Sequence, residues 1–110
     1  MLRHLQTYLS TALLAFLLST AGTGLAMAAE MTVYKSASCG CCGNWVKHMR
    51  MHGHTVEVRN MDDLDQVKQM AGVPEGLQSC HTAIVEGYVV EGHVPAAEVA
   101  TALEQGARMV

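Results

Sequence analysis

The sequence predicts one small domain of mixed α/β class that follows a secretory leader. After residue 30, stretches with the two-residue apolar period of a strand alternate with stretches of helical period, and no stretch repeats an earlier one. A chain of 110 residues that loses a leader keeps enough length for a single hydrophobic core. Three of the four cysteines fall between the first predicted strand and the first predicted helix, so they share one turn of this domain.

Residues 1–28 have the pattern of a secretory signal peptide. A basic start precedes an apolar run over residues 9–25, and a small-x-small sequence typical of cleavage sites ends at Ala28. We expect cleavage between Ala28 and Ala29, which leaves residues 29–110 as the exported mature domain, outside the membrane. An uncleaved membrane helix is the alternative, because the run is just long enough to span a bilayer.

The composition argues against several classes of partner and reaction. The formal net charge is −3 at pH 7 and the basic residues form no patch, so we expect neither nucleic acid nor anionic lipid as a partner. No Ser/His/Asp or paired-carboxylate arrangement for hydrolysis is discernible. We expect a monomer, exported to an oxidising compartment in which disulfides persist.

Seven elements are predicted along the mature chain. In order, they are a strand at 31–36, a helix at 42–52, a strand at 54–59, a helix at 63–71, strands at 82–85 and 88–90, and a final helix with Pro95 in its first turn. Asp62 or Asp63 is expected to cap the second helix, whose apolar positions include Met70. Proline suits the first turn of a helix because it lacks a backbone N–H.

The element order is β-α-β-α-β-β-α, which is the order of a thioredoxin-like α/β domain. The first two strands, joined by a helix, should be parallel, and the last two should form a hairpin through a tight turn. In this layout the loop before the third strand packs beside the turn that follows the first strand. We therefore expect Cys80 to lie next to Cys39, Cys41 and Cys42, although it is distant from them in sequence.

The cysteine turn favours the binding of a soft metal. A helix N-terminus stabilises thiolates, and Cu(I) prefers thiolates and accepts two or three of them. Cys39, Cys41 and Cys42 supply three sulfurs from one turn, with Cys80 closing the site. Zinc is the competitor because four cysteines also make a tetrahedral site, but three crowded cysteines are poorly shaped for one tetrahedron.

Two other interpretations of these sulfurs stay open. In the first, Cys39 and Cys42 form a structural disulfide and Cys41 is inert. In the second, the chain is a thiol–disulfide oxidoreductase, with Cys39 as the attacking thiol and Cys42 as the resolving thiol. The third strand is preceded by Cys80-His81 rather than by proline, which argues against the plain enzyme. Metal binding and redox chemistry can also share the same sulfurs.

The histidines carry weaker signals than the cysteines. His81 adjoins Cys80 and is an additional candidate ligand, with a hydrogen-bonded loop histidine as the equal alternative. For His93 a hydrogen-bonded loop histidine is favoured over a metal ligand. For His48, His52 and His54, incidental histidines at a solvated helix end are favoured over a secondary Cu(II) or zinc site.

Several motifs, in order along the mature chain, resemble the CopG-type family of small periplasmic copper resistance proteins. They are Tyr34-Lys35-Ser36-x-x-Cys39-Gly40-Cys41-Cys42-Gly43-x-Trp45, Gly72-Val73-Pro74, Ser79-Cys80-His81-Thr82-Ala83 and Gly87-Tyr88-Val89-Val90-Glu91-Gly92-His93-Val94-Pro95-Ala96. The resemblance implies a thioredoxin-like fold, export to the periplasm and a copper centre on Cys39, Cys41, Cys42 and Cys80. It also implies interconversion of Cu(I) and Cu(II) linked to copper efflux.

We therefore predict a periplasmic protein that binds Cu(I) through cysteine thiolates in copper resistance and handling. Its expected partners are copper ions and a periplasmic copper efflux or chaperone protein. Longer members of the CopG-type family continue past the last helix with a Met/Pro/Gly-rich extension that helps to bind metal. The given sequence stops at Val110, so we expect a thiolate site simpler than a multinuclear copper cluster.

Overall fold

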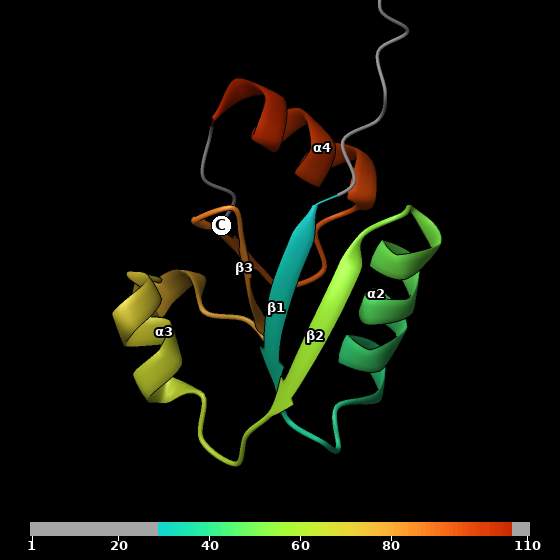
Figure 1. Cartoon of the computed structure of the whole chain (residues 1–110). Helices are drawn as coiled ribbons and strands as arrows, with labels where there is room; N and C mark the ends of the chain where they lie inside the picture. The colour runs from blue at the N-terminus through green and yellow to red at the C-terminus, as the bar shows by residue number, and fades with distance from the viewer. Residues whose placement is uncertain (1–28, 107–110) are drawn as a thin grey trace, which may run out of the picture.

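The computed structural model describes residues 29–106, which include all four cysteines. In this part of the chain, four strands, three α-helices and one 3₁₀ helix form one mixed α/β domain (Figure 1). In order, the elements are β1 (Glu30–Lys35), α2 (Gly40–Met51), β2 (Thr55–Asn60), α3 (Asp65–Ala71), the 3₁₀ helix η1 (Glu75–Leu77), β3 (Thr82–Val85), β4 (Tyr88–Glu91) and α4 (Ala96–Gln105). The predicted order is confirmed, with one short 3₁₀ helix added before β3. The predicted signal peptide, residues 1–28, lies outside the described residues.

The sheet brings three chain segments to one edge. Its strand order is β2-β1-β3-β4, with β1 and β2 parallel and the pairs β1/β3 and β3/β4 antiparallel. Tyr34 near the end of β1 therefore pairs with Thr82 at the start of β3, and Thr82 pairs with Glu91 at the end of β4. The loops that follow β1, precede β3 and follow β4 all lie at this edge.

Helices cover both faces of the sheet, with α2 and α3 on opposite sides (Figure 1). Trp45, Val46 and Met49 of α2 share one buried cluster with Ala96 and Val99 of α4, so these two helices enclose the main core. The strand residues in this cluster are Met31, Val33, Val56, Ala83, Val85 and Val90. Because side chains alternate along a strand, the residues between them point to the face that α3 covers.

The second predicted helix differs from the prediction in its cap and in its buried face. α3 begins at Asp65 with Leu64 as its N-cap, so neither predicted aspartate is the cap. Asp63 Oδ1 instead accepts a hydrogen bond from the Asp65 backbone N–H at 2.9 Å, a turn contact that precedes the helix. Met70 is 82% exposed rather than buried, because α3 directs Lys68 into the interior.

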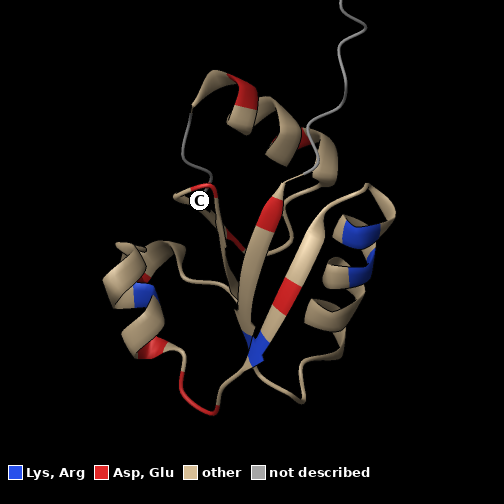
Figure 2. Ribbon diagram, viewed as in Figure 1, with Lys and Arg blue, Asp and Glu red and all other residues tan. Residues whose placement is uncertain are grey.

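Charged residues of both signs are spread over the described part of the chain (Figure 2). Basic residues lie along α2, on α3 and at the ends of β1 and β2, whereas acidic residues lie on the strands, before and on α3, and on α4. Within residues 29–106, no helix combines the length and the apolar character needed to cross a membrane.

Candidate metal centre

The start of α2 builds the cysteine turn. Cys39 is the N-cap residue, and its Sγ accepts a hydrogen bond from the Cys42 backbone N–H at 3.4 Å. Cys41 and Cys42 lie in the first turn of the helix, which contains no acidic residue. The start of α2 therefore presents three cysteines within one helical turn.

The fold brings Cys80 to this turn, as the predicted topology requires. Cys80 precedes β3, at the sheet edge where β1 ends. The sulfurs of Cys39, Cys41, Cys42 and Cys80 all lie within 4.8 Å of one another. Cys42 is fully buried, Cys41 is exposed, and the other two are half-buried. Four soft donors this close together form a cluster that is able to bind metal.

Two of the four sulfurs are joined in this structure. Cys39 and Cys42 form a disulfide with their Cα atoms 5.3 Å apart, whereas Cys41 and Cys80 are free. This pairing is expected both for a structural disulfide and for a redox-active pair. Because the thiolate is the metal-binding form, all four cysteines become available to metal only when this bond is reduced.

His81 is buried beside the cluster. It is 0% exposed, its Nδ1 lies 3.5 Å from Cys80 Sγ, and its ring centroid lies 4.6 Å from that of Trp45. Burial, and secondly the charge of His93, lower the pKa of His81 from 6.5 to about 4. The imidazole is therefore neutral near pH 7, which is the form that binds metal. Its buried Nε2 makes no well-formed hydrogen bond, which is uncommon for a buried polar atom.

His93 also lies at the cluster, a position that its sequence context did not predict. Its Nε2 is 3.4 Å from Cys80 Sγ, and its ring stacks on that of His81 with centroids 5.3 Å apart. The cause is topological, because β4 ends at the edge where β3 begins. Donor atoms of Cys42, Cys80, His81 and His93 form a second group within 4.8 Å of one another.

Known proteins resemble this chain in sequence and in fold. A family model described as "Protein of unknown function, DUF411" matches residues 77–110. Two solved structures named copper resistance protein CopG, form 2 and form 1, are each 40% identical to this chain and cover 71% of it, with TM-scores of 0.68 and 0.67. The predicted resemblance to CopG is confirmed. This chain spans 63% and 62% of those two CopG chains, and no curated protein matches it.

In this CopG-like domain, α2 holds the loop that carries His93. Trp45 Nε1 donates a hydrogen bond to the Val94 carbonyl at 2.7 Å, and His48 Nε2 accepts one from the Ala96 backbone N–H at 3.1 Å. Trp45 and His48 are three residues apart on α2, so both reach the same loop. The N-cap residue of α4 makes no side-chain cap hydrogen bond. His48 instead accepts a hydrogen bond from one of the free backbone N–H groups at the start of α4.

The other histidines near the end of α2 do not converge on one point with His48. His54 is buried and accepts a hydrogen bond from the Ala29 backbone N–H at 3.2 Å. The His52 ring contacts that of His48 edge to face, with centroids 4.6 Å apart. These contacts give His48 and His54 structural roles, whereas the sequence favoured incidental histidines at a solvated helix end.

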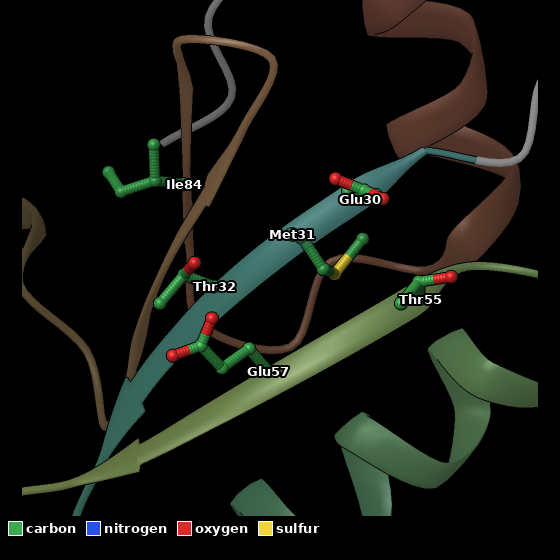
Figure 3. A pocket seen from close by; sticks show the side chains of 6 residues that line it. All are labelled: Glu30, Met31, Thr32, Thr55, Glu57 and Ile84. Atoms are coloured by element: carbon green, nitrogen blue, oxygen red, sulfur yellow. The ribbon is translucent and has the colours of Figure 1, made fainter.

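A groove of about 510 Å³ connects the cluster to solvent. Its lining residues are Cys41, Asn44, Trp45, His48, His93 and Pro95. A second pocket, of about 400 Å³, lies on the sheet surface formed by β1, β2 and β3 (Figure 3). The side chains of Thr32, Glu57 and Ile84 line it, together with those of three further residues that are neither cysteine nor histidine. This second pocket is therefore separate from the candidate metal centre.

A buried ion pair that the sequence patterns did not predict lies close to the cluster. Lys68 Nζ of α3 lies 2.6 Å from Glu91 Oε2 at the end of β4, and both side chains are almost fully buried. The sequence offers only a weak indication that Lys68 is buried. Lys68 directly follows the apolar Val67, but a charged residue in that position most often faces water.

Proposed function

We propose that this chain is an exported copper-binding protein with a thioredoxin-like fold. Its ligands for Cu(I) are the thiolates of Cys39, Cys41, Cys42 and Cys80, after reduction of the Cys39–Cys42 disulfide. The observation that carries this proposal is the approach of these four sulfurs to within 4.8 Å of one another. The likeness to proteins named copper resistance protein CopG supports copper as the metal.

The donor set of the described residues fits a soft ion. Both groups of donor atoms contain only sulfur and imidazole nitrogen, which suit Cu(I) better than they suit the hard cations. His81 is an additional ligand candidate because it is neutral and its Nε2 makes no well-formed hydrogen bond. Zinc competes for the same sulfurs, since it also accepts four thiolates. The groove beside the exposed Cys41 gives copper a path to the cluster.

The same sulfurs allow copper to change its oxidation state. Two Cu(II) ions each accept one electron, while the thiolates of Cys39 and Cys42 release two electrons and form their disulfide. The products are two Cu(I) ions and the disulfide, so electrons balance. Cys41 and Cys80 keep free sulfurs in the disulfide form and can hold Cu(I) there. Such interconversion serves copper resistance and handling.

Export places this chemistry in the periplasm. We propose that residues 1–28 are a cleaved signal peptide and that residues 29–110 are the mature, monomeric domain. A periplasmic copper efflux or chaperone protein then receives Cu(I) from the exposed side of the cluster, where Cys41 lies.

Anaerobic titration of the reduced protein with Cu(I), against a competing chelator, tests the proposal. We expect tight binding that Cys41→Ala and Cys80→Ala each weaken by at least about tenfold, because each change removes one thiolate. Met51→Ala is the matched control, since Met51 is a soft side chain that is 83% exposed and outside the cluster. If both cysteine variants keep the wild-type affinity and stoichiometry, the four-sulfur site is wrong.

A thiol–disulfide oxidoreductase is the second candidate function. It is favoured by one observation, the disulfide between the half-buried Cys39 and the fully buried Cys42, which matches an attacking and a resolving thiol. Reduction of insulin disulfides by metal-free protein tests it. Activity that survives Cys41→Ala, together with weak Cu(I) binding, would favour this enzyme over the copper protein.

A further inference from the structure

Two charged side chains are buried close to the candidate metal centre. The side chains of Lys68 on α3 and Glu91 on β4 are 5% and 1% exposed, and they contact each other at 2.6 Å. Lys and Glu are almost never fully buried unless paired, and a buried ion pair is weak evidence for stability because both charges lose their water. A pair in so small a core therefore needs a role besides packing.

The ion pair is hydrogen-bonded to both flanks of the segment that carries Cys80. On one flank, the Ser79 backbone N–H donates to Glu91 Oε2 at 3.0 Å. On the other, the Thr82 hydroxyl donates to Glu91 Oε1 and accepts from Lys68 Nζ, the latter at 2.9 Å. One carboxylate thus fixes the segment on both sides of the cysteine.

The ion pair and the sulfur cluster lie on opposite sides of this segment. Ala83 and Val85 of β3 belong to the core beneath α2 and α4, so Thr82, which alternates with them, points to the α3 face. His81 points the other way and contacts Trp45 of α2. The pair therefore supports the segment from the face opposite the sulfurs.

The cysteine turn has its own, separate support. Cys39, Cys41 and Cys42 are fixed by the start of α2 and by the hydrogen bond from the Cys42 N–H to Cys39 Sγ. A shift of the Cys80 segment would therefore change the distance between Cys80 and the turn, while the turn itself would stay in place.

We propose that Lys68 and Glu91 are positioning residues of the metal centre, which hold residues 79–82 so that Cys80 faces the cysteine turn. The part of this proposal that concerns copper binding rests on the proposed function. The placement of Cys80 itself can be measured without copper, so the two proposals can fail separately.

The test replaces the pair by apolar residues of similar size, Lys68→Met with Glu91→Leu, which leaves no buried charge unpaired. Alkylation of each cysteine in the reduced, metal-free protein is followed by mass spectrometry. Cys41 is the internal reference because it is exposed and belongs to α2. We expect Cys80 alkylation to accelerate about tenfold relative to Cys41, because the segment opens more often. The Cu(I) affinity should fall by a similar factor, while circular dichroism shows a folded protein.

Three further variants make the test specific. Lys68→Met with Glu91→Gln keeps an oxygen that accepts from the Ser79 N–H, and its amide NH2 can donate to the Thr82 hydroxyl, which no longer accepts from Lys68, so this variant should retain wild-type Cys80 reactivity. Arg59→Met with Glu57→Leu removes a surface pair whose side chains are 54% and 62% exposed, and should change neither measurement. Thr82→Val removes both hydrogen bonds of the Thr82 hydroxyl, to Glu91 and from Lys68, but leaves the one from Ser79. It should give an intermediate acceleration, which decides the matter if the apolar pair fails to fold.

Wild-type Cys80 reactivity in a folded Lys68→Met, Glu91→Leu protein, or in Thr82→Val, would overturn the positioning role. The pair would then contribute to stability alone. A wild-type protein that binds no Cu(I) would instead refute the proposed function. The alkylation ratio of Cys80 to Cys41 would still measure whether the ion pair holds the segment.

Discussion

The imidazole of His81 lies against two other rings: it stacks on His93 and is tilted by 38° against Trp45. Protonation there would place a charge in a buried site, near His93 and Lys68, and the Gly92 backbone and Glu91 would offset only part of this cost. The neutral ring is therefore strongly preferred. Protonation of His81 in acid should lower the free energy of unfolding.

We expect the metal-free protein to lose stability as the pH falls from 6.5 to 4. The folded-state pKa of His81 is about 4, below the ordinary value of 6.5, so the unfolded chain binds more protons throughout this window. Stability from this residue is complete above pH 6.5, and the loss at pH 4 is on the order of 3 kcal/mol. Urea denaturation at several pH values measures it. His81→Gln should give a flatter profile, and parallel profiles for the two proteins would contradict the assignment.

At the scale of single elements, α2 connects two parts of the site. Its first turn carries the cysteines, and its next turns hold the loop before α4 through Trp45 and His48. One helix therefore sets the position of the sulfurs and of His93 together.

Trp45→Phe should destabilise the protein by about 1 kcal/mol, because it keeps a ring against His81 but removes the hydrogen bond to the Val94 carbonyl. Denaturation followed by circular dichroism is the measurement, since the chain's one tryptophan is lost. His52→Gln, at an exposed position of the same region, serves as the control and should change stability little. An unchanged midpoint for Trp45→Phe would show that the hydrogen bond contributes nothing.

Gly92 links the end of β4 to the Cys80 segment. Its φ is +76°, and a Cβ there would lie 2.7 Å from Ser79 Oγ. We expect Gly92→Ala to cost about 1–2 kcal/mol, because an L side chain is strained in this region of backbone space.

Gly43→Ala is the matched change. A Cβ on this helical glycine would meet nothing within 4 Å, so we expect stability to stay constant or to rise by up to about 1 kcal/mol. Chemical denaturation of both variants compares them. Equal stabilities would mean that the Gly92 backbone relaxes freely.

At the scale of the whole molecule, the strand and helix patterns predicted the order of elements and the approach of Cys80 to the cysteine turn. The approach of Cys80 follows from the topology alone. Parallel β1/β2 and antiparallel β1/β3 pairing place the cysteine turn and the Cys80 segment at the same edge of the sheet. The position of His93 was not predicted, since it depends on how the loop after β4 is held by Trp45. The buried Lys68 was missed for another reason. Its partners Thr82 and Glu91 are distant in sequence, and charge alone predicts exposure.

The state of the disulfide should govern the stability of the whole domain. Its loop is short, with a sequence separation of 3, so reduction should cost the metal-free protein about 2 kcal/mol in the chain-entropy model. Cu(I) supplied at a free concentration a hundredfold above its Kd should then restore about 2.7 kcal/mol. Anaerobic denaturation of the oxidised, reduced and copper-loaded protein measures all three. Reduced protein that gains no stability from Cu(I) would contradict binding to the folded state.

The antiparallel pairing of β1 with β3 has a consequence for the order in which the chain acquires its sulfurs. A chain delivered from its N-terminus presents Cys39, Cys41 and Cys42 while Cys80 is still to come. The Cys39–Cys42 bond needs only neighbouring residues, so a nascent chain can close it early and protect two thiols from mispairing. The four-sulfur cluster, by contrast, exists only after the β3–β4 hairpin has docked on β1. Copper held by all four sulfurs would therefore report that this hairpin has docked and that the Cys39–Cys42 bond has been reduced.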